Sequence, residues 1–526
     1  MIFLVLLASF SFFSAKRLLT YLHIFQQDEY DNSRFLKWVL KHRAFDKRLT
    51  ILLCCTLLIN QLIVLHSNLI TFLIALLFTI FAFNESDPRR IAKKKLVLTS
   101  RAQRIFLIAF VFAVMMGCIY YFIPAPWWWI VSVQSLPLLL AFANEFLRPV
   151  EKLIQQKYWD DACKKVRELQ PFIIGITGSF GKTSVKHILG HILEVTSRVL
   201  ITPGSVNTPM GISRTIRERL KPYHKFFVVE MGAYGPGSIT RLCKLTPPNM
   251  AIITGIGYAH YERFKSIETV AKAKFELAEA VCKIGGKIVT NDEVLAFPYT
   301  RAFADTNKDN FILIDDKNAT ISIKNIQQQR EGLIIDIIRN GEMFVLEVPL
   351  YGKHHAKNVA LAFAAACEMG IPPATVAAAL KSTPQIPHRL QLQQQVNGAV
   401  VIDDAYNSNP EGFLAALELL DILGQSSGRR ILVTPGMVEL GKVHDMEHAR
   451  IGCEAVRHTD IVLAIAPEQI KSFVDAFRAN MQPHQELIPC PTFAVAQCWL
   501  TQHTGDKDVI LIENDLPDLY EASLNL

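Results

Sequence analysis

The sequence lacks the cysteine spacing of a zinc site or a disulfide framework. Its ten cysteines include no C-x-x-C pair, and several stand inside apolar runs, as Cys54, Cys55 and Cys118 do. We therefore expect reduced cysteines in apolar surroundings, with neither disulfides nor zinc. Internal repeats and low-complexity tracts are missing as well. Domain boundaries must therefore be inferred from hydropathy and motifs.

The placement of the basic residues argues against a nucleic-acid-binding protein, although the chain is basic. The net charge is +7 and the pI is about 8.8, but the lysines and arginines flank apolar segments, so we expect no nucleic-acid partner. Hydrophobic residues make up 50% of the 526 residues, and the mean hydropathy is +0.23. These values are high for a soluble enzyme and the chain is too long for one core. We therefore expect roughly three or four units, part of them in lipid.

Five apolar segments fill the first 150 residues. They lie at about 1–15, 49–66, 68–85, 105–123 and 126–146. The last four approach the roughly 20 residues that a helix needs to cross a bilayer. The first segment is short and has no basic residue before it, which favours an uncleaved anchor over a signal peptide.

The basic residues between these segments set the expected topology. They are concentrated at 16–48 and 89–104, whereas the connections at 67–68 and 124–129 carry none. By the positive-inside rule the basic connections face the cytoplasm, which predicts five crossings and a cytoplasmic chain after Leu147. Residues 1–150 are therefore expected to form an α-helical transmembrane domain of about five helices, which could also bind a lipid substrate.

The remaining chain alternates strands with helices. After a polar helical linker at 148–170, we expect strands at 173–177, 226–231, 250–254 and 287–290, and antiparallel strands within 310–350. A second α/β unit begins at Gln385, with strands near 399–403, 430–434, 460–465 and 508–512. The pattern predicts two α/β domains with mostly parallel sheets, at 151–384 and 385–526.

A glycine-rich stretch with one lysine joins the first expected strand to a helix. It covers residues 173–184 and reads IIGITGSFGKTS. Gly178 and Gly181 would let backbone N–H groups and the helix N-terminus point at an anion. Lys182 would reach the outer phosphates of a nucleotide, and the Thr183 hydroxyl would bind Mg²⁺. Isoleucine replaces the first glycine of the usual G-x-x-x-x-G-K-[ST] motif, so generic P-loop families fit less well.

Two polar residues follow later strands of the same sheet. Glu230 and His260 each come after an apolar strand, so both should lie at the carboxyl edge beside the loop, where open α/β sheets bind ligands. A carboxylate and an imidazole there can hold Mg²⁺ directly or through water. A surface glutamate and an ordinary loop histidine are the alternative. Lys274, taken alone, reads as part of the exposed face of an amphipathic helix.

Two histidine pairs have metal-ligand spacing, and we favour an ordinary role for both. His444 and His448 enclose an H-x-x-E-H pattern of zinc proteases, but the pattern follows glycines in a loop just ahead of a helix. His187 and His191 are four residues apart in the helix after the glycine-rich loop. An exposed helix face explains that spacing as well as a metal does.

From about residue 171 to 515 the chain resembles the Mur ligase family, and most closely its MurF branch. Eight blocks carry the resemblance: GITGSFGKTS (175–184), NTPMGI (207–212), VVEMGA (228–233), ITGIGYAH (253–260), AKAKFE (271–276), GKHHAKNVALA (352–362), DDAYNSNP (403–410) and MVELG (437–441). The resemblance implies an ATP-dependent amide ligase of peptidoglycan synthesis. In such an enzyme a substrate carboxylate takes the γ-phosphoryl group of ATP, and an amine then displaces phosphate from the acyl phosphate.

The resemblance also implies roles for the metal-binding residues. Lys182 would contact the β- and γ-phosphates, and Thr183 with Glu230 would bind one Mg²⁺. His260 would bind a second Mg²⁺, together with Lys274 if that lysine is carbamylated as it is in family members. The catalytic set implied is Lys182, Glu230, His260, Lys274 and Arg389.

The remaining implied contacts concern the nucleotide and the carboxyl substrate. Asn358 would contact adenine, Arg389 would reach the phosphates from the second α/β domain, and Asp404 would contact the ribose or the hinge. The implied ATP-binding set is Gly178, Ser179, Gly181, Lys182, Thr183, Ser184, Asn358, Arg389 and Asp404. Asn207 and Thr208 would face the substrate. The two domains would close over ATP and exclude water.

Two departures from the MurF pattern keep the substrates open. Membrane segments stand where MurF proteins have a soluble UDP-sugar-binding domain. The carboxyl substrate is then a UDP-linked or lipid-linked muropeptide, or an acidic polymer as in membrane-attached poly-γ-glutamate synthetases. After the last strand, Glu513-Asn514-Asp515-Leu516 replaces the usual Lys-Gly-Ser-Arg, so the amine is D-alanyl-D-alanine or another amino acid. We expect an enzyme of a bacterial inner membrane with cytoplasmic catalytic domains; a non-catalytic scaffold is the remaining alternative.

Overall fold

The computed structural model describes residues 2–514 except 29, 42–43, 64–66, 86, 90–94, 123–126, 258–263, 265, 316–318, 406–408, 425–427, 438–439 and 441–442. Contacts within the chain divide it into two compact units. The helical unit ends at Gln155, and the α/β unit begins at Gln156. Each unit is described by itself.

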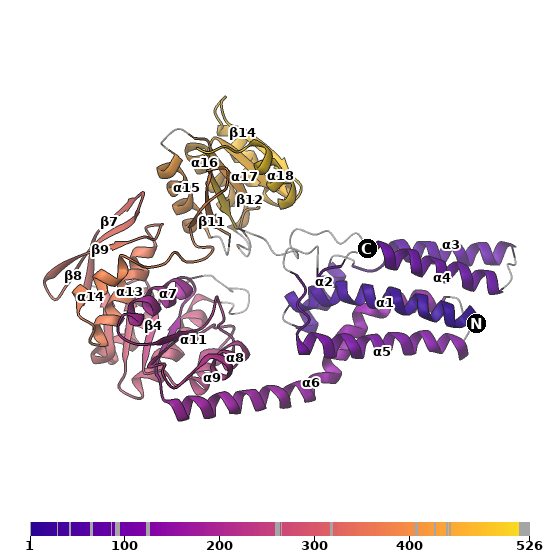
Figure 1. The fold of residues 1–526 in the computed structure, drawn as a ribbon, viewed down its shortest axis with the longest axis horizontal. Helices are drawn as coiled ribbons and strands as arrows, with labels where there is room; N and C mark the ends of the chain where they lie inside the picture. The colour runs from indigo at the N-terminus through magenta and orange to yellow at the C-terminus, as the bar shows by residue number, and fades with distance from the viewer. Residues whose placement is uncertain are drawn as a thin grey trace. The chain divides into compact units, whose positions relative to one another are not determined.

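The helical unit is built from long apolar helices that pack side by side (Figure 1). Its helices are α1 (Ile2–Gln27), α2 (Asn32–Lys41), α3 (Lys47–Ile63), α4 (Ser67–Asn84), α5 (Ser100–Phe122) and the first part of α6 (Trp128–Leu169). The core of the unit includes an aromatic cluster in which the Phe10, Phe78 and Trp129 rings lie 5.0 to 5.6 Å apart. The described part of each apolar segment therefore lies almost entirely in a helix, and the short first segment belongs to a helix of 26 residues.

Length and hydropathy single out the helices that can cross a bilayer. Within the described residues, α1, α5 and α6 are long and apolar enough, and α4 is a shorter apolar helix. The expected count of five crossings stays a prediction, because it depends on where the helices lie relative to a membrane.

An ion cluster lies buried inside the helical unit. Arg17, which is 4% exposed, belongs to α1 and not to a loop. Its Nη2 lies 2.9 Å from Asp46 Oδ2 and 3.0 Å from Glu85 Oε2. Asp46 directly precedes α3, and Glu85 directly follows α4. The cluster therefore ties α1 to the ends of two other helices.

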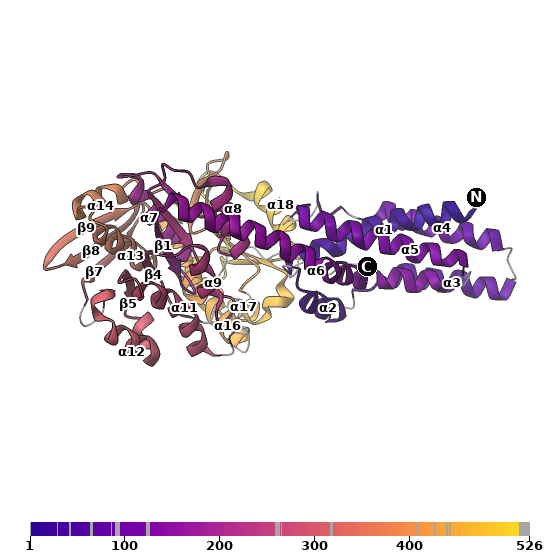
Figure 2. The ribbon, with the colours of Figure 1, turned by 90° about the horizontal axis from the view of Figure 1, so that it is seen from below.

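The first domain of the α/β unit contains a nine-stranded sheet. Its strands are β1 (Phe172–Thr177), β2 (Val199–Ile201), β3 (Phe226–Glu230), β4 (Met250–Ile253), β5 (Lys287–Asn291), β6 (Phe311–Ile314), β7 (Ile321–Gln329), β8 (Gly332–Arg339) and β9 (Glu342–Val348). The strand order is β2-β3-β1-β4-β5-β6-β7-β8-β9. Pairing is parallel from β2 to β7, and β7, β8 and β9 pair antiparallel (Figure 2). The parallel sheet and its antiparallel edge agree with the sequence prediction.

Helices cover both faces of this sheet because successive strand residues point to opposite sides. Ile174 and Ile176 pack with α7 (Lys182–Glu194), α13 (His355–Glu368) and α14 (Pro373–Leu380). Ile173 packs on the other face, with α8 (Pro209–Arg219), α9 (Ser238–Leu245), α11 (Ile267–Cys282) and α12 (Pro298–Thr306). The result is a three-layer domain in which α7 follows β1 directly.

The last part of α6 packs on this domain. Ser213 Oγ donates a hydrogen bond of 2.7 Å to the backbone oxygen of Tyr158, and the Arg217 guanidinium lies 3.9 Å above the Tyr158 ring. Arg241 lies over the Trp159 ring in the same way, at 5.4 Å. The polar linker expected at 148–170 is therefore helical, and it continues the helix of the last apolar segment.

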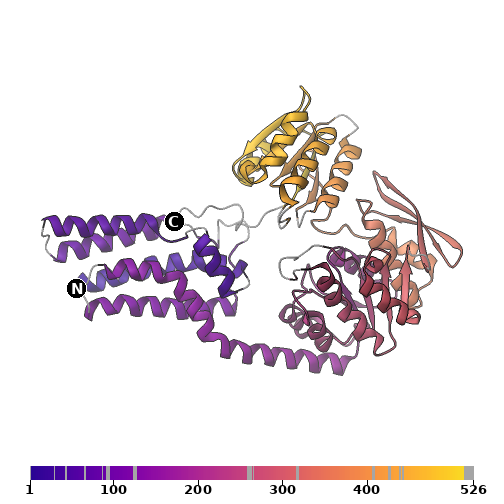
Figure 3. The ribbon, with the colours of Figure 1, turned by 180° about the vertical axis from the view of Figure 1, so that it is seen from behind.

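The second domain of the α/β unit has its own sheet (Figure 3). Its strands are β10 (Gln391–Gln394), β11 (Val400–Asp404), β12 (Arg430–Thr434), β13 (Ile461–Ile465), β14 (Glu486–Cys490) and β15 (Val509–Glu513), and its helices are α15 (Pro410–Gly424), α16 (His444–His458), α17 (Lys471–Asn480) and α18 (Phe493–His503). The order is β10-β11-β15-β12-β13-β14, with β10 antiparallel to an otherwise parallel sheet.

Candidate active site

The glycine-rich loop lies between β1 and α7, as its sequence predicts. Gly181 has a φ of 77°, in the left-handed region that favours glycine. A Cβ on Gly181 would clash with Asn358 Oδ1, and a Cβ on Gly178 would clash with Thr254 Oγ1. Ser179 N donates to the Gly255 oxygen at 2.8 Å. The loop is therefore held against the end of β4 and the start of α13, with its glycines where no side chain fits.

Lys182 begins α7 and folds back over the loop. Its Nζ donates to the backbone oxygen of Gly178 at 2.8 Å. Burial lowers the pKa of Lys182; the charge of Glu230 opposes this shift, while the charges of Arg389 and Lys186 add to it. Lys182 therefore lies in a site already rich in positive charge, which favours binding of a polyanion.

Glu230 ends β3 inside the same site and is 1% exposed. Thr183 Oγ1 donates to its Oε2 at 2.9 Å, and Asn207 Nδ2 donates to its Oε1 at 3.1 Å. Lys186 Nζ donates to Oε2 as well, at 2.9 Å. The structure thus brings together three residues that the sequence singled out, Thr183, Asn207 and Glu230. It adds Lys186, which the sequence analysis missed although it lies one helical turn after Thr183. Thr208 caps α8, because its Oγ1 accepts from Gly211 N at 3.4 Å.

Lys274 is buried in α11, so its interpretation as part of an exposed helix face is wrong. The residue is 4% exposed. Burial holds the pKa of Lys274 well below its usual value, and the charge of Lys182 lowers it further. An uncharged amine is therefore favoured near the phosphate loop. His260 lies outside the described residues. Within the described part of the chain, no group of three or more His, Cys, Asp or Glu is placed to hold a metal.

Polar residues at the start of α13 and in the linker complete the site. Asn358 is buried beside Gly181, and its Nδ2 lies 3.4 Å from His355 Nδ1. Burial lowers the pKa of His354 to about 4, and the positive charge of Arg389 lowers it further. Arg389, which lies between the two sheets in the sequence, thus acts electrostatically on both the loop lysine and α13.

Asp404 ends β11 and supports the linker that carries Arg389. Its Oδ1 accepts a hydrogen bond of 3.2 Å from the backbone nitrogen of Leu390. Burial raises the pKa of Asp404 to about 6, although the Arg389 charge opposes the shift. Asp404 is paired in register with Glu513 of β15, so two buried carboxyl groups lie side by side at the carboxyl edge of the second sheet.

The histidine pairs with metal-ligand spacing are engaged in other contacts. His448 Nδ1 lies 2.8 Å from the His444 oxygen, and Met437 N donates to His448 Nε2 at 3.0 Å. His191 Nε2 lies 3.1 Å from both the Ala379 oxygen and Ser382 Oγ. These hydrogen bonds give both histidines an ordinary structural role.

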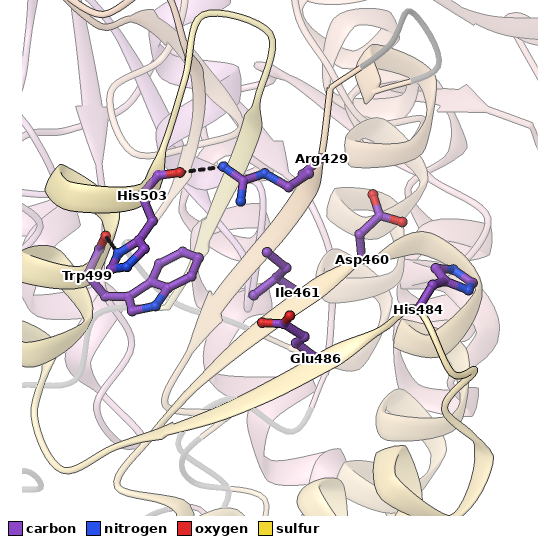
Figure 4. A pocket seen from close by; sticks show the side chains of 7 residues that line it. All are labelled: Arg429, Asp460, Ile461, His484, Glu486, Trp499 and His503. Carbon is purple, nitrogen blue, oxygen red and sulfur yellow. Dashed lines mark hydrogen bonds between the residues drawn. The ribbon is translucent and has the colours of Figure 1, made fainter.

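A cavity of about 570 Å³ lies in the second domain, away from this site (Figure 4). It is lined by Arg429, Asp460, Ile461, His484, Glu486, Trp499 and His503. Ile461 and Glu486 begin β13 and β14, so the cavity lies at the amino ends of these strands. Open α/β sheets bind their ligands at the carboxyl ends of the strands. The glycine-rich loop lies at that edge of the first sheet, and Asp404 lies at that edge of the second.

The fold and the site together define a class: a two-domain α/β protein with a glycine-rich loop between a strand and a helix, and an arginine in the linker between its sheets. Comparison with known families then gives the particular family. The Mur ligase middle domain matches residues 176–366, and the domain described as "Mur ligase, glutamate ligase domain" matches 388–513. These matches cover more than half of the chain, which therefore belongs to the Mur ligase family.

Similar proteins point to one branch of this family. The UDP-N-acetylmuramoyl-tripeptide–D-alanyl-D-alanine ligase of Mycobacterium leprae is 32% identical over 311 residues, which are 54% of this chain and 59% of that protein. The Bacillus subtilis enzyme of the same name is 31% identical over 291 residues, 55% of this chain and 61% of that protein. The chain thus spans about three fifths of the length of these relatives.

Solved structures show the same fold. MurF from Thermotoga maritima, in complex with ADP, has a TM-score of 0.57 at 23% identity and covers 70% of this chain and 82% of its own. MurF from Acinetobacter baumannii has a TM-score of 0.57 at 22% identity and covers 69% of this chain and 77% of its own.

Proposed function

We propose that the protein is an ATP-dependent amide ligase of the MurF type, which joins D-alanyl-D-alanine to the peptide carboxyl group of a muramoyl precursor. One observation carries the proposal. The positive charges of Lys182 and Arg389 meet at the glycine-rich loop, beside the Glu230 carboxylate. A triphosphate and an ionised carboxyl group repel each other, so positive charge must screen both before they can react. The MurF relatives supply the candidate substrates.

The residues at the site fit the Mg²⁺ that the family implies. Mg²⁺ prefers hard oxygen ligands, and Thr183 Oγ1 and Glu230 Oε2 converge at 2.9 Å. These two residues would hold the ion, which would neutralise phosphate charge when bound. Lys274 would serve a second ion as a carbamate, a modification that requires the uncharged amine that its surroundings favour.

The proposed reaction has two steps. A carboxylate oxygen attacks the γ-phosphorus, and the bond to the bridging oxygen breaks with ADP as the leaving group. The amine nitrogen then attacks the acyl carbon, phosphate leaves and the nitrogen loses a proton. Lys182 and Arg389 would screen the phosphates, and the backbone N–H groups of residues 180–183 would orient them. Asn207 would position the carboxyl substrate beside Glu230.

A second candidate is a ligase for a different amine, and the end of β15 favours it. Glu513 is fully buried next to Asp404, and Asn514 Nδ2 donates to the Gly436 oxygen at 2.6 Å. A second carboxylate, such as that of D-alanyl-D-alanine, would gain no cation from this segment. An amine that carries no extra negative charge fits the segment better.

For location, we propose a bacterial inner membrane with the α/β unit in the cytoplasm. The support is the apolar length of α1, α5 and α6 and the exposed large apolar residues of the helical unit, among them Leu4, Phe83 and Phe122. The cytoplasmic side follows from the basic connections. A lipid-linked muropeptide is then available to the enzyme, as well as a UDP-linked one.

The test is a substrate screen on the full chain in detergent. ADP release is measured with UDP-muramoyl peptides, lipid-linked muropeptides or glutamate as carboxyl substrates, each combined with candidate amines. We expect release that needs both substrates and that Lys182→Ala abolishes. Release with glutamate alone would establish the polymer ligase, and no release with any pair would favour the scaffold.

A further inference from the structure

Lys186 is a buried cation to which the proposed chemistry gives no role. Its side chain is 0% exposed, and it lies on α7 one turn after Thr183. The ammonium group contacts Glu230 Oε2 at 2.9 Å and also donates to the backbone oxygen of Gly204. Gly204 has a φ of 49° and belongs to the loop that leads from β2 to Asn207. Lys186 thus connects the carboxylate to the segment that carries the predicted substrate contacts.

The hydrogen bonds of Glu230 leave little capacity for a free metal ion. Its Oε2 accepts from both Lys186 and Thr183, and its Oε1 accepts from Asn207. The single negative charge of the carboxylate is matched by the single positive charge of Lys186, and water is excluded from the pair. A divalent cation that approaches without a nucleotide meets a neutral pair, and it gains little attraction there.

Bound nucleotide changes this balance. A triphosphate brings several negative charges and its own oxygen ligands to the loop, which is the usual way in which Mg²⁺ is held with few protein carboxylates. We propose that Lys186 is a positioning residue that fixes the Glu230 carboxylate and cancels its charge. The site then binds a divalent ion only together with the nucleotide. The inference rests on the proposed nucleotide site, but it concerns ion binding and not ligase turnover.

The experiment measures Mn²⁺ binding to the full chain in detergent, without nucleotide, by electron paramagnetic resonance of the free ion. Lys186→Met keeps most of the length of the side chain, removes the charge and leaves Thr183 and Asn207 as donors to Glu230. We expect wild-type protein to show no binding below millimolar Mn²⁺ and Lys186→Met to bind at least about tenfold more tightly, because one opposing charge is gone. Equal binding by the two proteins would overturn the proposal.

Three further variants assign the effect. The double variant Lys186→Met/Glu230→Gln should lose the gained binding; if it keeps the gain, Glu230 is not the ligand and the proposal fails. Lys186→Arg keeps the charge and should bind Mn²⁺ as weakly as wild type does. This variant covers the case in which Lys186→Met does not fold. Tighter Mn²⁺ binding by a folded Lys186→Arg would count against charge cancellation. Lys381→Met removes an exposed lysine paired with Glu347 at 3.1 Å and should change nothing. If no substrate pair supports ADP release, the proposed function fails, but these Mn²⁺ titrations still decide the inference.

Discussion

The helical unit and the α/β unit each bury a cation against carboxylates, yet the two clusters differ in what surrounds them. Arg17 faces two carboxylates, Asp46 and Glu85, that flank the ends of two other helices. Lys186 faces one carboxylate, Glu230, which also accepts hydrogen bonds from Thr183 and Asn207. The first cluster has a surplus of negative charge and joins structural elements. The second lies among further cations and opens onto a loop shaped for an anion.

The comparison teaches that burial of an ion pair does not by itself mark a functional site. Removing water makes either pair costly to break, so both are candidates for a stabilising role. The distinguishing feature is surplus positive charge beside a loop that can hold an anion. Burial and the charge of Lys182 lower the pKa of Lys274, and burial with the charges of Arg389 and Lys186 lowers the pKa of Lys182; a bound polyanion would favour the charged form of both lysines.

Loss of Lys274 should have the largest effect. We expect Lys274→Ala to lower substrate-dependent ADP release on the order of 10³-fold, because it removes the amine that would form the carbamate ligand of the second ion. Lys272→Ala, an exposed position two residues away on the same helix, is the matched control and should keep full activity. Partial recovery of Lys274→Ala on addition of a short carboxylate would support the carbamate. Full turnover without any addition would show that Lys274 only fills the core.

Much of the α/β unit could be predicted because its central strands are continuous apolar runs, such as those around Ile174, Val228 and Ile252. The edge strands β2, β10 and β14 were missed. β2 is only three residues long, and the other two were missed for a physical reason. An edge strand needs only one hydrogen-bonded neighbour and is partly solvated, so its sequence can be polar or contain proline, as Pro489 in β14 shows. Periodicity alone cannot identify such strands.

The buried cations were hard to predict for a related reason. A lysine on a helix or an arginine between apolar segments is exposed by default, and Lys186, Lys274 and Arg17 all read that way from their neighbours in sequence. Their burial depends on residues that the fold brings from elsewhere, such as Glu230 for Lys186 and Glu85 for Arg17. Similarity to a family identified Lys274, whereas only its position one helical turn after Thr183 pointed to Lys186.

Removal of Arg17 should damage the helical unit and spare the α/β unit. Arg17→Met leaves Asp46 and Glu85 buried without their cation, which should cost about 3 kcal/mol of folding free energy. We expect the helical unit to unfold at a lower temperature in detergent, as measured by limited proteolysis. ADP release should be unchanged below that temperature. Arg148→Met removes an exposed partner of Glu145 and serves as the control. If both variants unfold at the same temperature, the ion pairs of Arg17 do not stabilise the helical unit.

Titration of Asp404 should make the second domain less stable as the pH rises. The folded-state pKa of Asp404 is about 6, above the ordinary value of 3.8. Between pH 3.8 and about 6, Asp404 is therefore protonated in the folded protein and ionised in the unfolded chain. The stabilisation is complete below pH 3.8 and is lost as the pH rises through about 6, with a total of about 3 kcal/mol at most. Asp404→Asn should flatten this dependence in urea unfolding monitored by Trp499 fluorescence. An equally steep slope in the variant would assign it to another group.

Loss of an exposed ion pair should have the smallest effect, and it sets the baseline for the two buried clusters. Arg214 and Glu218 lie one helical turn apart on α8, 2.9 Å from each other, with side chains 75% and 54% exposed. Water already solvates both groups and salt screens them, so Arg214→Ala should change the unfolding free energy by less than about 0.5 kcal/mol. The measurement is urea unfolding at low and at high salt, where the small difference should shrink further. If Arg214→Ala lowered the unfolding free energy as much as Arg17→Met does, solvent exposure would not determine how much an ion pair contributes to stability. The contrast between buried and solvated charge would then be wrong.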